Sequence, residues 1–275
     1  MNLDAYLERI GYDGPRTPTL DTLRAVTRLH ATAIPFENLS VLVDGPPDLD
    51  LPALMAKLVD AGRGGYCYEQ NGLLAAALAA LGFRLHELSA RVRHGVPPEV
   101  VTPRSHRLMS VETPEGIAYA DAGFGGLTLT GPVMARLQEE QETPHERVRL
   151  VPAENDFLLQ ALVGDAWTDL YRFDLTVQLP ADYVQQNRHT ATRPDGLFAN
   201  NLVVAMPMPD GRYTLFNRTL TWRPLAGAKT QTELRSKADL RETLAEVFSI
   251  EASQAELDRA WQVSERAAAL HPAFS

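Results

Sequence analysis

The chain has 275 residues, 45% of them hydrophobic, which is enough to bury a sizeable core. Its net charge of −9 argues against nonspecific nucleic-acid binding, and no apolar run approaches the roughly 20 residues of a transmembrane helix. The single cysteine excludes an internal disulfide, and the N-terminus lacks the pattern of a secretory signal. We expect a cytoplasmic protein without a nucleic-acid partner, a membrane partner or a metal cofactor.

The N-terminal part of the chain has the apolar spacing of helices. Apolar residues recur on one helix face in two stretches, a third stretch is rich in alanine, and a glycine follows each of the three closely. Asp50 stands at the N-cap position of the second stretch. The three predicted helices cover residues 3–10, 51–58 and 68–81.

From Arg84 onward, short segments rich in strand formers and bounded by Gly and Pro replace the helical pattern. The predicted strands cover residues 88–93, 106–112, 117–121, 167–179, 202–206 and 213–222. Helical spacing returns at residues 240–248 and 254–267. We therefore predict an α+β protein in three parts: a helical bundle (1–85), a β-rich part (86–195) and a mixed α/β part (196–275).

The only cysteine, Cys67, follows a two-glycine loop and precedes the apolar run of the third predicted helix. The positive end of a helix dipole favours a thiolate over a thiol, which predicts a nucleophile at this position. The alternative is a buried and inert cysteine, because free cysteine is among the most buried residue types.

A histidine and an aspartate stand on neighbouring predicted strands, joined by a turn over Thr113–Gly116. If Thr113 and Gly116 face each other, Asp121 pairs with Leu108, and His106 is a diagonal neighbour on the same face. The carboxylate would then orient the imidazole that takes the proton of a cysteine nucleophile. A one-residue slip would separate the two, leaving a solvated histidine and a turn aspartate as the alternative.

A glycine-rich segment, residues 122–128, follows Asp121 directly. Glycine lets a backbone approach a ligand closely, and amides in such a loop can bind phosphate oxygens. We therefore predict Gly125, Gly126 and Thr128 as cofactor-binding residues, with an ordinary tight loop as the alternative.

These segments resemble the arylamine N-acetyltransferase family of prokaryotic type. The family pattern R-G-G-x-C-[FY]-E-x-N is matched without a gap at Arg63–Asn71, I-P-F-E-N at Ile34–Asn38, and D-x-G-F-G at Asp121–Gly125. Ala122 departs from the family, where valine is common. The resemblance covers most of the chain and thins after about residue 225, and it includes Trp167–Phe173, Leu197–Asn201 and Phe216–Arg218.

The resemblance implies a Cys67–His106–Asp121 triad with a cysteine-protease-like core. It also implies a helical bundle, a central β-barrel and a C-terminal α/β lid. Acetyl-CoA would be the acyl donor, and arylamines or arylhydrazines the acceptors. Arg63 and Glu69 look like residues that hold the active-site loop. The implied acceptor pocket is lined by Phe36, Val92, Phe124 and Phe198.

Three alternatives remain open from the sequence. An amide synthase that closes a macrolactam from a carrier-bound polyketide would use the same triad. A cysteine hydrolase would let water attack the acyl-enzyme in place of an amine. A non-enzymatic scaffold would keep the triad without using it, although the intact motifs argue against that. The sequence does not indicate the oligomeric state.

Overall fold

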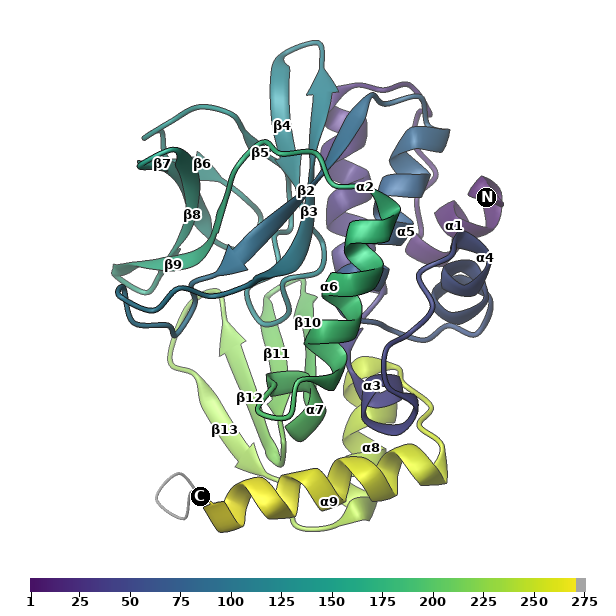
Figure 1. Cartoon of the computed structure of the whole chain (residues 1–275). Helices are drawn as coiled ribbons and strands as arrows, with labels where there is room; N and C mark the ends of the chain where they lie inside the picture. Colours follow the sequence, from purple (N-terminus) through teal and green to yellow (C-terminus); the bar gives the residue numbers. More distant parts are fainter. Residues whose placement is uncertain (271–275) are drawn as a thin grey trace.

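The computed structural model describes residues 1–270 and confirms the predicted α+β class (Figure 1). Within these residues, no helix combines the length and the apolar character needed to cross a membrane. The helices are α1 (Leu3–Ile10), α2 (Leu20–Ala33), α3 (Leu39–Asp44), α4 (Leu51–Leu54), the π-helix η1 (Met55–Asp60), α5 (Cys67–Ala80), α6 (Pro180–Thr192), α7 (Leu197–Asn200), α8 (Lys237–Phe248) and α9 (Gln254–Leu270). The strands are β1 (Phe36–Glu37), β2 (Leu85–Val92), β3 (Arg104–Thr113), β4 (Gly116–Ala120), β5 (Val133–Met134), β6 (Gln141–Glu142), β7 (Arg147–Ala153), β8 (Asp156–Val163), β9 (Ala166–Phe173), β10 (Val203–Met208), β11 (Gly211–Phe216), β12 (Thr219–Pro224) and β13 (Thr230–Glu233).

The N-terminal helices α1, α2 and α5 pack with η1 around one apolar core. Asn2 caps α1 by accepting the Ala5 N–H, and Gly11 ends that helix in the left-handed conformation, as predicted. Asp50 stands at the predicted N-cap, but its side chain makes no capping hydrogen bond. Helix α5 is buried along most of its length, so it forms the centre of the bundle.

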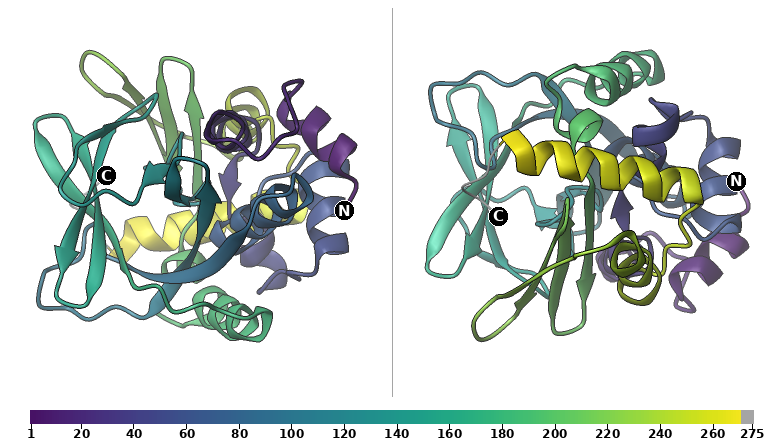
Figure 2. Two further views of the ribbon diagram at one scale, coloured as in Figure 1. Left: turned by 90° about the horizontal axis from the view of Figure 1, so that it is seen from above. Right: turned by 90° about the horizontal axis from the view of Figure 1, so that it is seen from below.

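Eight antiparallel strands form the largest sheet, in the order β5-β4-β3-β2-β9-β8-β7-β6, and curve into a nearly closed barrel (Figure 2). The β3–β4 hairpin has the predicted register, since Thr113 pairs with Gly116 and Met109 with Ala120. Side chains from most of these strands fill the interior of the barrel with a second apolar core. The hairpin brings Ala120, at the end of β4, beside Met109 in the middle of β3.

A second sheet joins distant parts of the chain, in the order β1-β10-β11-β12-β13. Strand β1 comes from the N-terminal part and pairs with β10 through Phe36↔Ala205 and Glu37↔Val204. Helix α9 runs across the end of the molecule where α3, α7 and α8 also lie, and contacts all three (Figure 1). The N-terminal part therefore contributes a strand and a helix to the C-terminal sheet and its core.

Two predicted strands were wrong in extent, and several helices and strands were missed. The strand predicted over 167–179 ends at Phe173, because Pro180 begins α6, where its fixed φ suits the first helical turn. The strand predicted over 213–222 is the hairpin β11–β12, which turns at Asn217 with a positive φ of 54°. The longest elements that were not predicted are helices α2 and α6 and strands β7 and β8; the short elements α3, α7, β1, β5, β6 and β13 were missed as well.

Candidate active site

Cys67 is the first residue of α5 and is 3% exposed. Its position at a helix N-terminus is the predicted one. The Glu69 carboxylate accepts the Tyr66 N–H at 3.1 Å, which fixes the entry of the chain into the helix. The first N–H groups of a helix lack partners within the helix, so this end of α5 carries partial positive charge.

The loop before Cys67 lies against the segment that leads into β1. The Gly65 N–H donates to the Pro35 carbonyl at 3.3 Å, and the Glu37 N–H donates to the Gly65 carbonyl at 3.1 Å. A Cβ atom at Gly64 would lie 2.2 Å from the Pro35 carbonyl oxygen. A side chain at Gly64 would therefore force the two segments apart, which explains the glycine at this position.

Gln70 anchors the same loop from inside the helical bundle. Its amide donates to the Pro35 carbonyl at 2.8 Å and to the Gly65 carbonyl at 3.2 Å. Its oxygen accepts from His30 Nε2 at 2.8 Å, so the other ring nitrogen, Nδ1, accepts from the Tyr6 hydroxyl at 2.8 Å. Burial lowers the pKa of His30 to about 4, so its ring is neutral at pH 7. The sequence did not indicate this network.

His106 and Asp121 meet as the predicted register requires. His106 Nε2 lies 2.7 Å from Asp121 Oδ2, and both residues are almost fully buried. Burial alone would lower the pKa of His106, but the Asp121 charge and the Cys67 thiol raise it to about 10. Burial would raise the pKa of Asp121, but the His106 charge and hydrogen bonds lower it. The ion pair is the favoured state at neutral pH.

Asn71 of α5 joins this helix to strand β3 and to the segment that follows β4. Its amide donates to Asp121 Oδ1 at 2.8 Å and to the Arg107 carbonyl at 2.5 Å, and its oxygen accepts the Ala122 N–H at 2.9 Å. Asn71 lies one turn of α5 after Cys67. It belongs to the sequence motif around Cys67, which was the only signal that could have identified it.

The glycine-rich segment that follows Asp121 passes close to Cys67. A Cβ atom at Gly123 would lie 2.9 Å from the Cα of Cys67, so only glycine fits this contact. The Gly123 N–H donates to Asp121 Oδ1 at 2.8 Å. The Cys67 thiol lies 3.7 Å from the Ser105 carbonyl, next to His106 in the chain.

Aromatic rings enclose the imidazole. The His106 ring centroid lies 4.9 Å from that of Tyr171 and 5.1 Å from that of Phe124. The Tyr171 hydroxyl is buried and has no hydrogen-bond partner among residues 1–270, and burial together with the Asp121 charge raises its pKa. These rings exclude water from the ion pair, which strengthens it. Sequence reasoning did not identify Tyr171.

A cavity of about 780 Å³ opens over Cys67 and His106. All four predicted acceptor-pocket residues line it, and so do Gly125 and Gly126. Thr128 does not line it, because its hydroxyl accepts the Phe124 N–H at 2.8 Å inside the loop. Among the described residues, no group of three His, Cys, Asp or Glu side chains is placed to hold a metal ion. The four acceptor-pocket residues are Phe36, Val92, Phe124 and Phe198.

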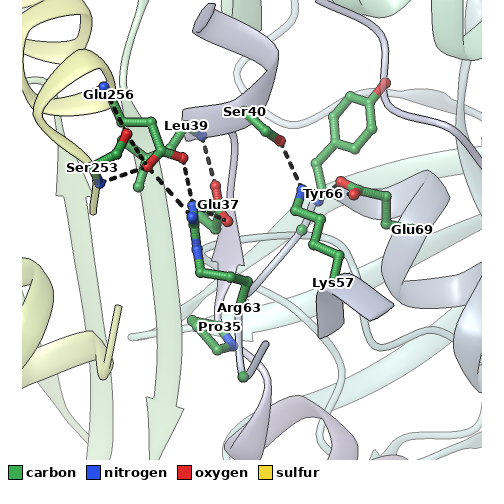
Figure 3. A network of polar contacts seen from close by, with 12 residues as sticks. Pro35, Glu37, Leu39, Ser40, Lys57, Arg63, Tyr66, Glu69, Ser253 and Glu256 are labelled. Atoms are coloured by element: carbon green, nitrogen blue, oxygen red, sulfur yellow. Dashed lines mark hydrogen bonds and ion pairs between the residues drawn. The ribbon is translucent and has the colours of Figure 1, made fainter. Parts of the chain in front are cut away.

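A network of charged side chains supports the loop that precedes Cys67 (Figure 3). Arg63 donates to Glu37 at 3.1 Å and to Glu256 of α9 at 2.7 Å. Lys57 of η1 bonds Glu69 at 2.7 Å and the Ser40 hydroxyl at 2.7 Å. Arg63 and Glu69 thus make polar contacts on the loop that carries Cys67, and Glu256 joins this loop to the C-terminal helix.

Comparison with known proteins shows which family the chain is similar to. Residues 19–257 match the family model described as N-acetyltransferase. The arylamine N-acetyltransferase of Escherichia coli K12 is 40% identical over 249 residues, covering 90% of this chain and 88% of that protein. The solved arylamine N-acetyltransferase of Mycobacterium marinum is 36% identical, with a TM-score of 0.92 over 96% of this chain and 100% of its own. The same M. marinum enzyme in complex with CoA gives a TM-score of 0.91 at 36% identity, over 96% of this chain and 99% of its own.

Proposed function

The chain belongs to the arylamine N-acetyltransferase family, and from this premise we propose that it transfers the acetyl group of acetyl-CoA to the nitrogen of an arylamine or arylhydrazine. The observation that carries the proposal is the buried His106–Asp121 ion pair beside Cys67, at the floor of one cavity. That arrangement supplies a nucleophile, a proton carrier and a group that orients it. The relative solved with CoA supports acetyl-CoA as the donor.

In the first half-reaction, the Cys67 thiolate attacks the carbonyl carbon of the acetyl thioester. The bond between that carbon and the sulfur of CoA breaks, and the leaving thiolate takes the proton of the His106 imidazolium. The products are acetyl-Cys67, free CoA and a neutral imidazole. The raised pKa of His106 supports this order of events, because it keeps the ring protonated before the donor arrives.

In the second half-reaction, the amine nitrogen attacks the carbonyl carbon of acetyl-Cys67. Neutral His106 accepts the amine proton, the carbon–sulfur bond breaks, and the thiolate–imidazolium pair is restored. Asp121 holds the ring through Nε2, which leaves Nδ1 as the nitrogen that serves the sulfur and the amine. Asp121 is thus the orienting member of the triad.

The apolar part of the cavity fits the acceptor. Phe36 and Phe198 lie with ring centroids 5.9 Å apart, and Phe124 packs edge-on against His106. An aromatic amine would stack among these rings while its nitrogen faces Cys67. Exclusion of water by the same rings would protect the acetyl-enzyme from hydrolysis.

Intact-protein mass spectrometry tests the mechanism directly. Acetyl-CoA added without amine should raise the mass by one acetyl group, mapped to Cys67, and an arylamine should remove the adduct. Double-reciprocal plots at several amine concentrations should be parallel. Cys67→Ser should give neither adduct nor turnover.

Other outcomes would overturn the proposal. Release of acetate that an added amine does not divert would indicate a cysteine hydrolase. Intersecting plots without any acetylated protein would indicate direct transfer in a ternary complex. Transfer of long carrier-bound acyl chains, with none from acetyl-CoA, would indicate an amide synthase.

A further inference from the structure

A second histidine, His94, packs against Phe124 at the wall of the cavity. Strand β2 ends at Val92, and both Val92 and His94 line the cavity, as expected for residues two apart at the end of a strand. The His94 ring meets Phe124 edge-on, with ring centroids 6.5 Å apart. No sequence motif indicated a role for this histidine.

Backbone hydrogen bonds fix the position of His94. The His94 N–H and the Arg93 N–H both donate to the Leu170 carbonyl, at 3.1 Å and 2.8 Å. The Thr102 hydroxyl donates to the Val92 carbonyl at 2.8 Å, which ties the far end of the following loop to β2. A residue held in this way loses little further freedom when its side chain binds a ligand.

The ring nitrogens of His94 differ from those of the structural histidines. His30 and His145 have both ring nitrogens bonded to other groups of the protein. Neither ring nitrogen of the partly buried His94 makes a hydrogen bond within residues 1–270. Burial, together with the Arg223 charge, lowers the pKa of His94, so the ring is neutral at pH 7. A neutral imidazole offers one hydrogen-bond donor and one acceptor.

The Phe124 ring relates His94 to the reacting groups. The same ring packs edge-on against His106, with centroids 5.1 Å apart. In the proposed reaction, the nitrogen of the arylamine lies beside Cys67 and His106. An aromatic ring that starts there and covers Phe124 directs its far end, para to the nitrogen, toward His94.

We propose that His94 is a specificity-determining residue, which hydrogen-bonds a polar group para to the nitrogen of the arylamine. The preferred substrates are then arylamines with a hydroxyl group at this position. A methyl group there would cover the His94 nitrogens without bonding them, and a site built for a hydrogen bond rejects an analogue that cannot form it. This inference rests on the proposed acetylation of arylamines, and it narrows the class of arylamine.

The test compares 4-aminophenol with 4-methylaniline, which differ in one group of similar size. Chromatographic measurement of the acetylated products gives kcat/KM for each amine at one concentration of acetyl-CoA. His94→Phe keeps a ring against Phe124 and removes both nitrogens, so the ratio of kcat/KM for 4-aminophenol to that for 4-methylaniline should fall about 10-fold. The intrinsic reactivities of the two amines cancel when this ratio is compared between proteins.

Two further variants identify the cause of the change. His94→Gln supplies a hydrogen-bond donor and an acceptor again, so it should keep most of the wild-type ratio. His86 also belongs to β2, but it is exposed and does not line the cavity. His86→Phe is therefore the matched control and should leave the ratio unchanged.

An unchanged ratio in His94→Phe, whether both rates fall or neither does, would overturn the inference. A ratio in His94→Gln as low as that in His94→Phe would overturn it as well. If wild-type protein acetylates neither amine, the proposed function fails separately. Titrations followed by nuclear magnetic resonance then still test His94: wild-type protein should bind 4-aminophenol more tightly than 4-methylaniline, and His94→Phe should not. Equal binding of both amines to wild-type protein would contradict the inference.

Discussion

Asp121 shows how much of the proposed chemistry depends on one buried residue. Its carboxylate accepts hydrogen bonds from the His106 ring, the Asn71 amide and the Gly123 N–H. These bonds keep it charged despite complete burial, and the charge in turn keeps His106 protonated. Asp121 therefore contributes in two ways, through its charge and through the hydrogen bonds that fix its position.

The substitution Asp121→Asn separates them. It preserves the size of the side chain and removes the charge, so the pKa of His106 should fall and the ring should lose its preferred tautomer. The comparable change in a serine-protease triad lowers the rate about 10⁴-fold, and we expect a loss of several orders of magnitude here. Acetylation of Cys67, followed by intact mass, measures it. Circular dichroism must show a folded variant, and activity within a few-fold of wild type would make Asp121 purely structural.

Asn71 is the second residue whose removal should be costly. Asn71→Ala leaves the buried Arg107 carbonyl and the Ala122 N–H without partners. Each unsatisfied buried group costs about 1–3 kcal/mol, so urea unfolding should show a loss of that order or larger. Asp121 would also lose the hydrogen bond from the Asn71 amide, so its orientation toward His106 should be less fixed and the acetylation rate should fall. An equally stable and active variant would contradict this role.

At the scale of elements, the glycine-rich segment packs against the start of α5. This contact places Asp121 and His106 near Cys67. Gly123→Ala would put a methyl group 2.9 Å from the Cα of Cys67 and should shift the nucleophile. A displacement of about 1 Å can lower the rate about 100-fold, which sets the expected loss. Gly131→Ala is the control, because its Cβ would meet nothing closer than 3.7 Å. Equal activities of the two variants would contradict the steric argument.

Helix α9 is linked to the nucleophile loop through one buried carboxylate. Glu256 accepts from Arg63 at 2.7 Å and from the Ser253 N–H at 2.8 Å. Glu256→Gln should therefore lower the free energy of unfolding by about 1–3 kcal/mol, as expected for a buried charged hydrogen bond. Asp258→Asn removes the exposed pair with Lys237 and should leave the stability almost unchanged, because water screens an exposed pair. Denaturant titrations of both variants compare the two, and similar losses would assign no special role to Glu256.

For the whole molecule, two buried histidines set opposite pH dependences. His106 has its pKa raised from 6.5 to about 10, so its contribution to stability is complete below pH 6.5 and is lost as the pH rises through about 10. His30 has its pKa lowered to about 4, so its contribution is complete above pH 6.5 and is lost as the pH falls through about 4. Both together predict maximal stability near pH 6.5.

Thermal unfolding measured between pH 4 and pH 10 tests this. The melting temperature should fall on both sides of the maximum. His30→Gln should flatten the acidic side, and Asp121→Asn should flatten the alkaline side. If His30→Gln left the acidic fall in melting temperature unchanged, His30 would not be its cause. The same holds for Asp121→Asn, the alkaline fall and His106.

Local signals in the sequence predicted the segments around Cys67, His106 and Asp121 better than they predicted the rest of the fold. The glycines before Cys67 and the turn at Thr113–Gly116 predicted the helix start and the hairpin register, and both were confirmed. The roles of Cys67, His106 and Asp121 in a reaction stay predictions, as does the division of the chain near residues 85 and 195. Thr128 stays a predicted cofactor-binding residue whose hydroxyl is already bonded within its loop.

By itself, the sequence determined what short-range rules control: the apolar spacing of α1, the glycines that end helices, and the register of a tight hairpin. Only the tertiary structure decided which distant groups meet. Glu256 reaches Arg63 across 193 residues, and Asn71 reaches Asp121 across 50. The physical reason is that burial, and with it the pKa of His106 and of His30, depends on packing between segments, which no local pattern encodes.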